Sequence, residues 1–258
     1  MIYVISDLHG FPIEKLKALL KKANFSEDDF LYILGDVVDR NGDGGVSVLL
    51  WLLEQYNVQL ILGNHEAMLL SCDFVFDEIT EDSVKAMDSE KIELLNNYML
   101  NGGDVTLKAL RKLPRETQQD ILDYLRDCPL YEAVTAGDND YILVHSGFDN
   151  FSKDKKISDY TPDDLIWAWP ELTDEYYDDI HTVFGHTPTM GYGEEYNGKI
   201  IKTRTWTDID CGAGFGNEPI LLRLDDYAEF SLAEDEVIDA VTKQVLDKYL
   251  DAFKKLAE

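Results

Sequence analysis

The chain has 258 residues, of which 45% are hydrophobic, so it is long enough to bury a core and we expect one domain over residues 1–258. Its 51 acidic and 23 basic residues give a formal net charge of −28, which argues against nucleic acid and anionic membranes as partners. Three widely spaced cysteines argue against a disulfide framework, and without a basic leader or a membrane-length apolar run the chain is predicted to be cytoplasmic.

The first part of the chain alternates between apolar strands and amphipathic helices. Strands are predicted at residues 2–5, 30–34 and 58–62, and helices at 13–23 and 46–56. Such alternation is typical of parallel strands joined by right-handed crossovers. The sequence therefore predicts an α/β fold that begins with a β-α-β-α-β unit.

The middle of the chain changes character at residue 67. Residues 67–129 are acidic, with helical spacing of the apolar residues and a break at Gly102-Gly103, and we expect them to form an inserted helical cap. Strands return at 130–135 and 141–145, and the Gly-Asp-Asn-Asp sequence between them predicts a hairpin turn.

The last part of the chain predicts a second sheet and a terminal helix. It begins with a polar, aromatic-rich stretch at 148–180 and a short apolar run that ends at His186. Further short strands are predicted at 194–203, 206–210, 220–224 and 227–232. Residues 233–258 place apolar side chains four apart, which predicts a helix that covers either the core, the more common outcome, or a partner.

Polar residues follow the strands of the first unit. Asp36 and Asp39, three positions apart, come directly after the strand that ends at Leu34, and comparable polar loops follow the strands on either side of it in sequence. Open α/β sheets place their chemistry at the carboxyl ends of strands, so we expect three strand ends to converge. One carboxylate at that point is suited to bridge two metal ions.

The histidines point to the same chemistry. Four of the five, His9, His65, His145 and His186, each close an apolar, strand-like run. A lone histidine in such a place is more often a hydrogen-bonded loop residue than a ligand, but four in the same context favour a metal site. Histidine, aspartate and asparagine ligands suit Mn²⁺, Fe or Zn²⁺, whereas an oxygen-only set would suit Ca²⁺.

Five ordered motifs carry a family resemblance. They are Asp7-Leu8-His9-Gly10, Gly35-Asp36-Val37-Val38-Asp39-Arg40, Gly63-Asn64-His65-Glu66, His145-Ser146-Gly147 and Gly185-His186-Thr187-Pro188. In this order they resemble the calcineurin-like metallophosphoesterases, and most of all the branch of bacterial and phage serine/threonine protein phosphatases and symmetrical diadenosine tetraphosphate hydrolases. Residues 209–214 are similar to that branch's last motif strand. The resemblance implies a four-layer α-β-β-α sandwich.

The resemblance also implies a pair of divalent metal ions, Mn²⁺ first and Fe or Zn²⁺ as alternatives. One ion would be held by Asp7, His9 and Asp36, and the other by Asp36, Asn64, His145 and His186, with Asp36 as the bridge. Two dications and two carboxylates leave a local charge of about +2, which attracts phosphate although the whole chain is anionic. A hydroxide shared by the two ions would be the nucleophile.

Three further residues are assigned to catalysis by the same resemblance. His65 would protonate the leaving oxygen, with Asp39 on its other ring nitrogen to fix the tautomer. Arg40 would bind the substrate phosphate with its planar fork, and the alternative is a structural ion pair with a neighbouring carboxylate.

Other residues near the motifs have plainer expectations. Glu66 is expected to brace the following helix, His181 to sit at a solvated strand start, and Cys211 to be a small buried residue. Trp167 and Trp169 either line the rim of the site or pack the 148–180 segment.

The sequence departs from the protein phosphatases at their phosphate clamp. Leu62 stands where those enzymes carry arginine, as it does in diadenosine tetraphosphate hydrolases, and the arginine expected near 165–169 is also missing. Asn41 replaces the glycine often found after Arg40, and Arg204 is a candidate substitute for the lost clamp.

Three functions follow from these observations. The first hypothesis is a phosphomonoesterase acting on phosphoserine or phosphothreonine proteins or on small phosphate esters. The second, motivated by Leu62, is a symmetrical dinucleoside polyphosphate hydrolase. The third is a metal-bound regulatory protein that binds phosphate without turnover. The sequence leaves the oligomeric state open.

Overall fold

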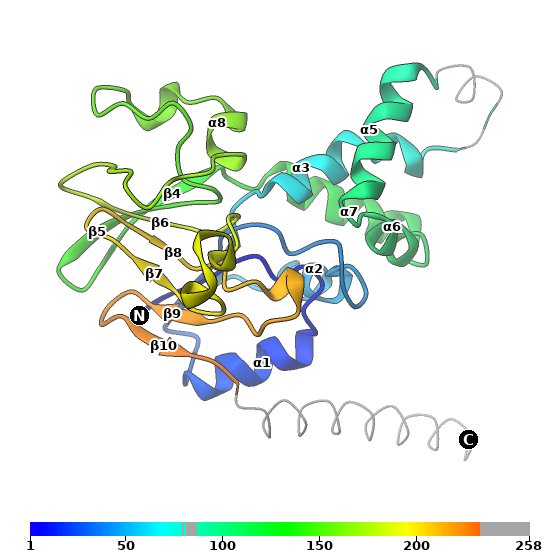
Figure 1. The fold of residues 1–258 in the computed structure, drawn as a ribbon. Coiled ribbons are helices and arrows are strands. Elements are labelled where there is room, and N and C mark those ends of the chain that lie inside the picture. The colour runs from blue at the N-terminus through cyan, green and yellow to red at the C-terminus, as the bar shows by residue number, and fades with distance from the viewer. Residues whose placement is uncertain (79, 81–86, 233–258) are drawn as a thin grey trace, which may run out of the picture.

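The structure, a computed structural model, describes residues 1–78, 80 and 87–232, and the described strands form two five-stranded sheets (Figure 1). The first sheet has the order β10-β9-β1-β2-β3, with bounds β1 Ile2–Ile5, β2 Phe30–Ile33, β3 Val58–Leu60, β9 Leu221–Arg223 and β10 Ala228–Phe230. The second sheet has the order β4-β5-β6-β8-β7, with bounds β4 Tyr131–Ala136, β5 Asn139–Val144, β6 His181–Phe184, β7 Ile201–Lys202 and β8 Trp206–Asp208.

The predicted β-α-β-α-β unit is confirmed. Strands β1, β2 and β3 pair in parallel, and helices α1 (Ile13–Lys22) and α2 (Val46–Leu52) form the connections between them. Strands β5, β6 and β8 are also parallel, so each sheet directs several strand ends to one edge.

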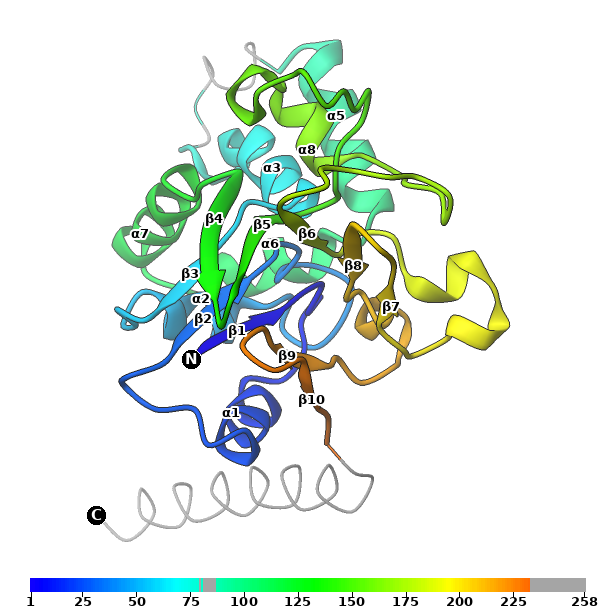
Figure 2. The ribbon, with the colours of Figure 1, turned by 90° about the vertical axis from the view of Figure 1, so that its left-hand side faces the viewer.

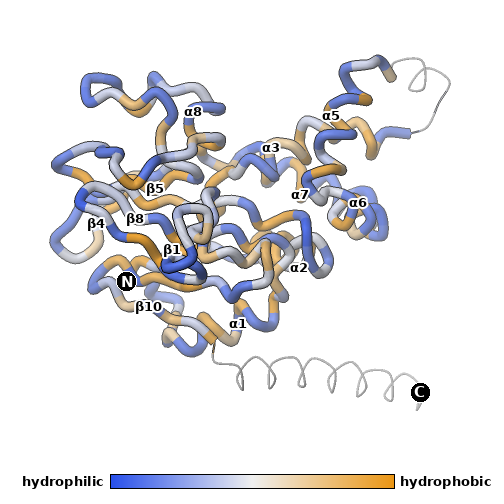
Figure 3. Tube along the Cα trace, viewed as in Figure 1, coloured by the Kyte–Doolittle hydropathy of each residue, from blue (hydrophilic) through white to orange (hydrophobic). Residues whose placement is uncertain are grey.

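Side chains of alternate residues divide the core into layers. In β1, Tyr3 and Ile5 pack with α1 and α2, whereas Val4 faces the second sheet. In β5, Leu143 faces the first sheet and Ile142 faces the opposite side. This period-two alternation explains why both sheets are hydrophobic on both faces. Figure 3 shows hydrophobic stretches, in orange, along strands of both sheets.

The outer face of the second sheet is covered mainly by irregular chain. One short helix, α8 (Pro162–Ile166), lies there, and aromatic residues of the 148–180 segment pack against the sheet. Phe148 alone contacts four other aromatic rings at centroid distances of 5.1 to 5.8 Å. The α/β sandwich predicted from the sequence is therefore confirmed, with a fourth layer that contains little helix.

Further helices lie beside the strand ends that carry the motifs (Figures 1 and 2). Their bounds are α3 Asn64–Ser71, α5 Ser89–Leu100, α6 Asp104–Leu110 and α7 Arg115–Arg126. All but the start of α3 fall within the range predicted as a helical cap, and the role of this range as a cap stays a prediction.

The predicted strand pair at 194–203 is wrong. Residues Glu194–Tyr196 form a 3₁₀ turn, and only Ile201–Lys202 joins the sheet as β7. The backbone there closes local turns, because Asn197 N donates to Glu194 O at 3.2 Å and Lys199 N to Tyr196 O at 3.0 Å. The predicted helix at 233–258 lies outside the described residues. Within the described ranges, we find no helix whose length and apolar character would allow it to cross a membrane.

Candidate metal centre

The loops after β1 and β2 are joined through their backbones. Asp7 N donates to Gly35 O at 3.1 Å and His9 N donates to Asp36 O at 2.9 Å. Gly35 has φ +88°, and a Cβ there would lie 2.4 Å from His145 Nδ1, so only glycine allows the second sheet to approach this closely. The predicted convergence of strand ends is thus present in the structure.

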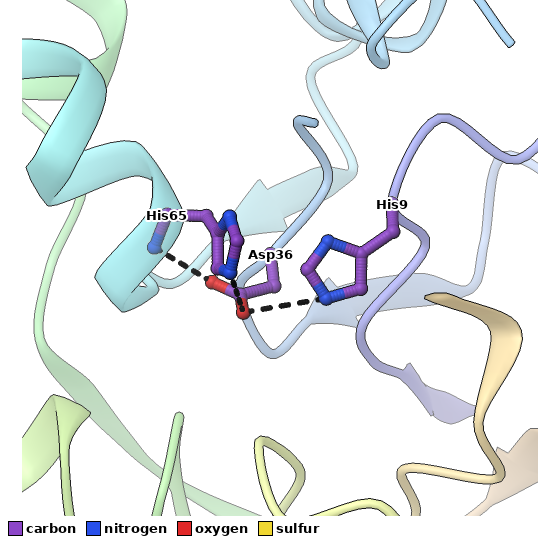
Figure 4. A group of neighbouring side chains, drawn as sticks. All are labelled: His9, Asp36 and His65. Atoms are coloured by element: carbon purple, nitrogen blue, oxygen red, sulfur yellow. Dashed lines mark hydrogen bonds and ion pairs between the residues drawn. The ribbon is translucent and has the colours of Figure 1, made fainter. Parts of the chain in front are cut away.

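Asp36 lies at the centre of this convergence. Its Oδ2 is 3.6 Å from His9 Nε2 and 3.9 Å from His65 Nε2, and its Oδ1 is 3.4 Å from His145 Nε2. Figure 4 shows His9 and His65 pointing at the carboxylate from two different elements. All four side chains are buried.

The two flanking histidines are oriented by carbonyl groups. His9 Nδ1 is 3.0 Å from Val38 O, and His145 Nδ1 is 2.7 Å from Leu34 O. A carbonyl only accepts, so Nδ1 carries the hydrogen in both rings and each Nε2 presents a lone pair toward Asp36. Burial lowers the pKa of His9 to about 3 and also lowers that of His145, which keeps both rings neutral and able to bind a cation.

Several acceptor atoms at the site lack a donor, which tests whether metal ions fit. His145 Nε2 lies 2.9 Å from Asn64 Oδ1, so two acceptors face each other. Asn64 Oδ1 can accept from His186 Nδ1 at 2.9 Å, but His186 Nε2 then has no partner among the described residues. Oδ1 of buried Asp7 has no partner among the described residues. Burial, Asp210 and Asp36 raise the pKa of Asp7 well above its usual value. Divalent cations would relieve both the repulsion and the unpaired acceptors, so these residues fit a metal pair.

The backbone of the site is strained. Nine non-glycine residues in the described part of the chain have positive φ. Six of them are predicted site residues: Asp7, His9, Asp36, Asp39, Arg40 and His186. Side chains other than glycine rarely adopt this left-handed region, and strain of this kind gathers at functional sites.

His65 and Asp39, the predicted acid pair, lie in hydrogen-bond contact. His65 Nδ1 is 2.7 Å from Asp39 Oδ2, and Arg40 Nη2 is 3.2 Å from His65 Nε2. Arginine only donates, so Nε2 accepts and Nδ1–H donates to Asp39. Burial opposes protonation of His65, but Asp36 and Asp39 outweigh it and raise its pKa. His65 Nε2 also groups with His9 and Asp36 within metal-ligand range, which leaves two roles for this ring.

Arg40 makes no ion pair with a carboxylate in the described ranges. Its guanidinium lies 4.9 Å from the Phe215 ring centre, and Gly214 packs against both Arg40 and His9. The alternative of a structural ion pair therefore has no support. Arg204, in contrast, bonds Glu175 at 2.7 Å and Asp178 at 2.9 Å at the start of β8, the opposite end from the site, so it is not a substitute clamp.

Comparison with protein families identifies the chain. The family model described as calcineurin-like phosphoesterase matches residues 1–209. The chain belongs to this family. A symmetrical bis(5′-nucleosyl)-tetraphosphatase of Buchnera aphidicola subsp. Schizaphis graminum is 35% identical over 101 residues, which are 38% of this chain and 35% of that enzyme.

Solved structures share the fold. One protein, provisionally described as a diadenosine tetraphosphatase, superimposes with a TM-score of 0.59 at 17% identity and covers 90% of this chain and 92% of its own. A serine/threonine phosphatase of Saccharomyces cerevisiae gives a TM-score of 0.52 at 17% identity, with coverage of 90% and 80%. At this identity both likenesses concern the fold alone.

Two residues that hold Asp39, the partner of His65, were not predicted from the sequence. Tyr98 Oη on α5 donates to Asp39 Oδ1 at 2.7 Å, and Thr106 Oγ1 on α6 lies 2.6 Å from the same oxygen. A Cβ at Gly103 would lie 2.5 Å from the Tyr98 ring, so the Gly102-Gly103 break allows the two helices to close on the site. That break was the one sequence signal available for these contacts.

Tyr98→Phe is expected to lower kcat about tenfold while the metal content stays unchanged. Burial and Asp39 raise the pKa of Tyr98, so its hydroxyl remains a donor, and its loss frees Asp39 to turn away from His65. Steady-state kinetics and elemental analysis would measure this, with exposed Tyr56→Phe as control. Wild-type kcat in Tyr98→Phe would show that Thr106 alone positions Asp39.

Glu66 braces more than the helix it was expected to brace. Its Oε2 accepts from Gly63 N at 3.1 Å, at the start of α3, and from Asp36 N at 2.8 Å. Its Oε1 accepts from Val37 N at 2.8 Å and Val38 N at 3.2 Å. The side chain is fully buried, so one carboxylate sets both the helix start and the Asp36 loop.

Glu66→Gln is expected to lower the free energy of unfolding by about 3 kcal/mol, because the amide nitrogen would face two buried N–H groups that lose their acceptor. Urea unfolding of the metal-free protein measures this directly, and exposed Glu54→Gln is the matched control. A loss below about 0.5 kcal/mol, the usual range of surface substitutions, would contradict the bracing role.

The remaining residues singled out from the sequence fall into place as follows. Trp167 and Trp169 line the rim, with rings 5.9 and 5.6 Å from the His186 ring. Cys211 is buried, as expected. His181 begins β6 but is half-buried and bonded to Thr207 at 2.9 Å, so the solvated position predicted for it is wrong.

Proposed function

We propose that this phosphoesterase hydrolyses a phosphoester or phosphoanhydride bond at a pair of divalent cations. The observation that carries the proposal is the set of unpaired acceptors around Asp36. The residues that would hold the ions are those predicted from the sequence: Asp7, His9, Asp36, Asn64, His145 and His186. Mn²⁺ suits this mixed nitrogen and oxygen set. When bound, such ions lower the pKa of water and neutralise phosphoryl oxygens.

The protein's own side chains supply proton transfer and orientation. His65 would take up a proton on Nε2 once Arg40 turns from it to the substrate, and would then give that proton to the departing oxygen. Asp39 stabilises the charged ring. Arg40, held by Phe215 and free of carboxylate partners in the described residues, would bind a phosphoryl oxygen. No covalent intermediate with the protein is required.

We place symmetrical dinucleoside polyphosphates first among the substrates. Leu62 in place of a clamp arginine and the tetraphosphatase activity named for the Buchnera relative support this choice. Phosphoserine, phosphothreonine and small phosphate esters, the first hypothesis from the sequence, become the second candidate. The cytoplasmic location and the lack of nucleic-acid and membrane partners also stay predictions.

A substrate panel on Mn²⁺-loaded protein tests both levels of this proposal. Diadenosine tetraphosphate should give two ADP molecules, faster than phosphate is released from p-nitrophenyl phosphate or a phosphothreonine peptide, and EDTA should stop all three reactions. Faster release from the peptide would favour the second candidate. Protein that holds two metal ions and turns over nothing in the panel would overturn the hydrolase and leave the regulatory function.

A further inference from the structure

Two cavities of similar size reach the candidate metal centre. The first, here the Trp169 cavity, is about 410 Å³ and is lined by Trp169, Pro170, Leu172, Thr187 and Tyr192, among others. Thr187 directly follows His186, a predicted metal ligand. Volumes of this size are usual for small-molecule sites.

The second, here the Trp167 cavity, is about 380 Å³ and lies between α3, α5 and α8. Its lining includes Asn64, Met68, Leu94, Asn97 and Trp167. Asn64 is another predicted ligand of the same metal ion, so both cavities open beside one end of the metal pair.

Each cavity is lined by a tryptophan that also contacts His186: Trp169 in the first and Trp167 in the second. The rings of Trp167 and Trp169 both contact the His186 ring edge to face, at interplanar angles of 89° and 75°. They are nonetheless 42% and 66% exposed. Each therefore offers a free aromatic surface close to the reacting centre, which is the arrangement that stacks flat rings.

We propose that each cavity receives one nucleoside of a dinucleoside polyphosphate, with its base stacked on Trp167 or Trp169 and the phosphate chain crossing the centre beside His186. This inference rests on the proposed function. Water adds to one phosphorus, the bridging P–O bond breaks, and the departing phosphate oxygen takes a proton, so a tetraphosphate held at both ends gives two nucleoside diphosphates.

A ratio of two substrates tests the assignment. Trp169→Ala should lower the kcat/KM for diadenosine tetraphosphate, relative to that for p-nitrophenyl phosphate, by about tenfold, the scale of one lost base stack. Trp169→Phe, which keeps an aromatic face, should restore the ratio to within about threefold. Tyr56→Ala, an exposed aromatic residue outside both cavities, is the control and should leave the ratio unchanged.

A binding measurement separates this inference from the proposed function. Calorimetric titration of Mn²⁺-loaded protein with ADP should show about tenfold weaker binding to Trp169→Ala than to wild type, whether or not the protein turns over substrate. If Trp169→Ala lowered kcat/KM equally for diadenosine tetraphosphate and p-nitrophenyl phosphate and left ADP binding unchanged, the cavity would not be a nucleoside site. The proposed hydrolase function would still stand. If Trp169→Ala instead lowered kcat/KM for a phosphothreonine peptide relative to p-nitrophenyl phosphate, the cavity would bind peptide and the nucleoside assignment would be wrong.

Discussion

Asp36→Asn is expected to release both metal ions and to lower turnover about a thousandfold. The carboxylate lies between His9 and His65 on one side and His145 on the other, so it is the only predicted ligand shared by the two ions. The amide keeps the shape and removes the charge. A metal ion contributes several kcal/mol to stabilising the charge that develops on phosphate, and about 4 kcal/mol corresponds to three orders of magnitude in rate.

Metal content and rate should be measured on the same samples. Elemental analysis should fall from two Mn²⁺ per chain to fewer than one, and kcat/KM for p-nitrophenyl phosphate should fall with it. Asp178→Asn, which removes an exposed carboxylate paired with Arg204, is the matched control. If Asp36→Asn retained both ions, Asp36 would not be the bridge.

For substrates with a poor leaving group, His65→Asn is expected to lower kcat by about 10² to 10⁴ while two metal ions remain bound. The loss should grow with the basicity of the leaving group, because only a poor leaving group needs the proton. We therefore expect a small effect on p-nitrophenyl phosphate and a large one on phosphoserine or a simple alkyl phosphate. A series of aryl and alkyl phosphates measures this dependence.

The same variant decides between the two roles open to His65. As an acid held by Asp39 at 2.7 Å, His65 can be lost without loss of metal. If His65 is instead a metal ligand together with His9 and Asp36, its replacement should lower the metal content. Leu70→Ala, on the same helix α3 but outside both cavities, controls for changes in packing. A loss of metal in His65→Asn, with no dependence on the leaving group, would refute the acid role.

Much of the fold and of the candidate site could be predicted because both depend on local pattern. An apolar run that ends in glycine and aspartate, as at Leu34-Gly35-Asp36, predicts a strand, the turn that follows it and a carboxylate at that turn from a few residues alone. Parallel strands of the first sheet then place such ends at one edge, which is why His9 and Asp36 meet in the structure. His145 reaches them from β5 of the second sheet.

Contacts between distant segments could not be predicted in this way. Tyr98 and Thr106 lie 59 and 67 residues from Asp39 in sequence, and nothing in their own segments distinguishes them from ordinary helix residues. Arg204 was chosen for its charge and its place before a motif strand, but direction along β8 puts it at the wrong end. The turn at Glu194–Tyr196 satisfies its backbone locally, which competes with any strand pattern.

Because site residues have positive φ, we expect the loops of the site to open before the sheets when this protein is heated. Each such residue costs about 1 kcal/mol or more, and the loops at Asp7–His9 and Asp36–Arg40 carry most of them. Once the cations are stripped away, amide hydrogens of these loops should exchange with deuterium long before those of β1 and β2. On heating, activity should therefore be lost at temperatures at which circular dichroism still reports the folded α/β sandwich.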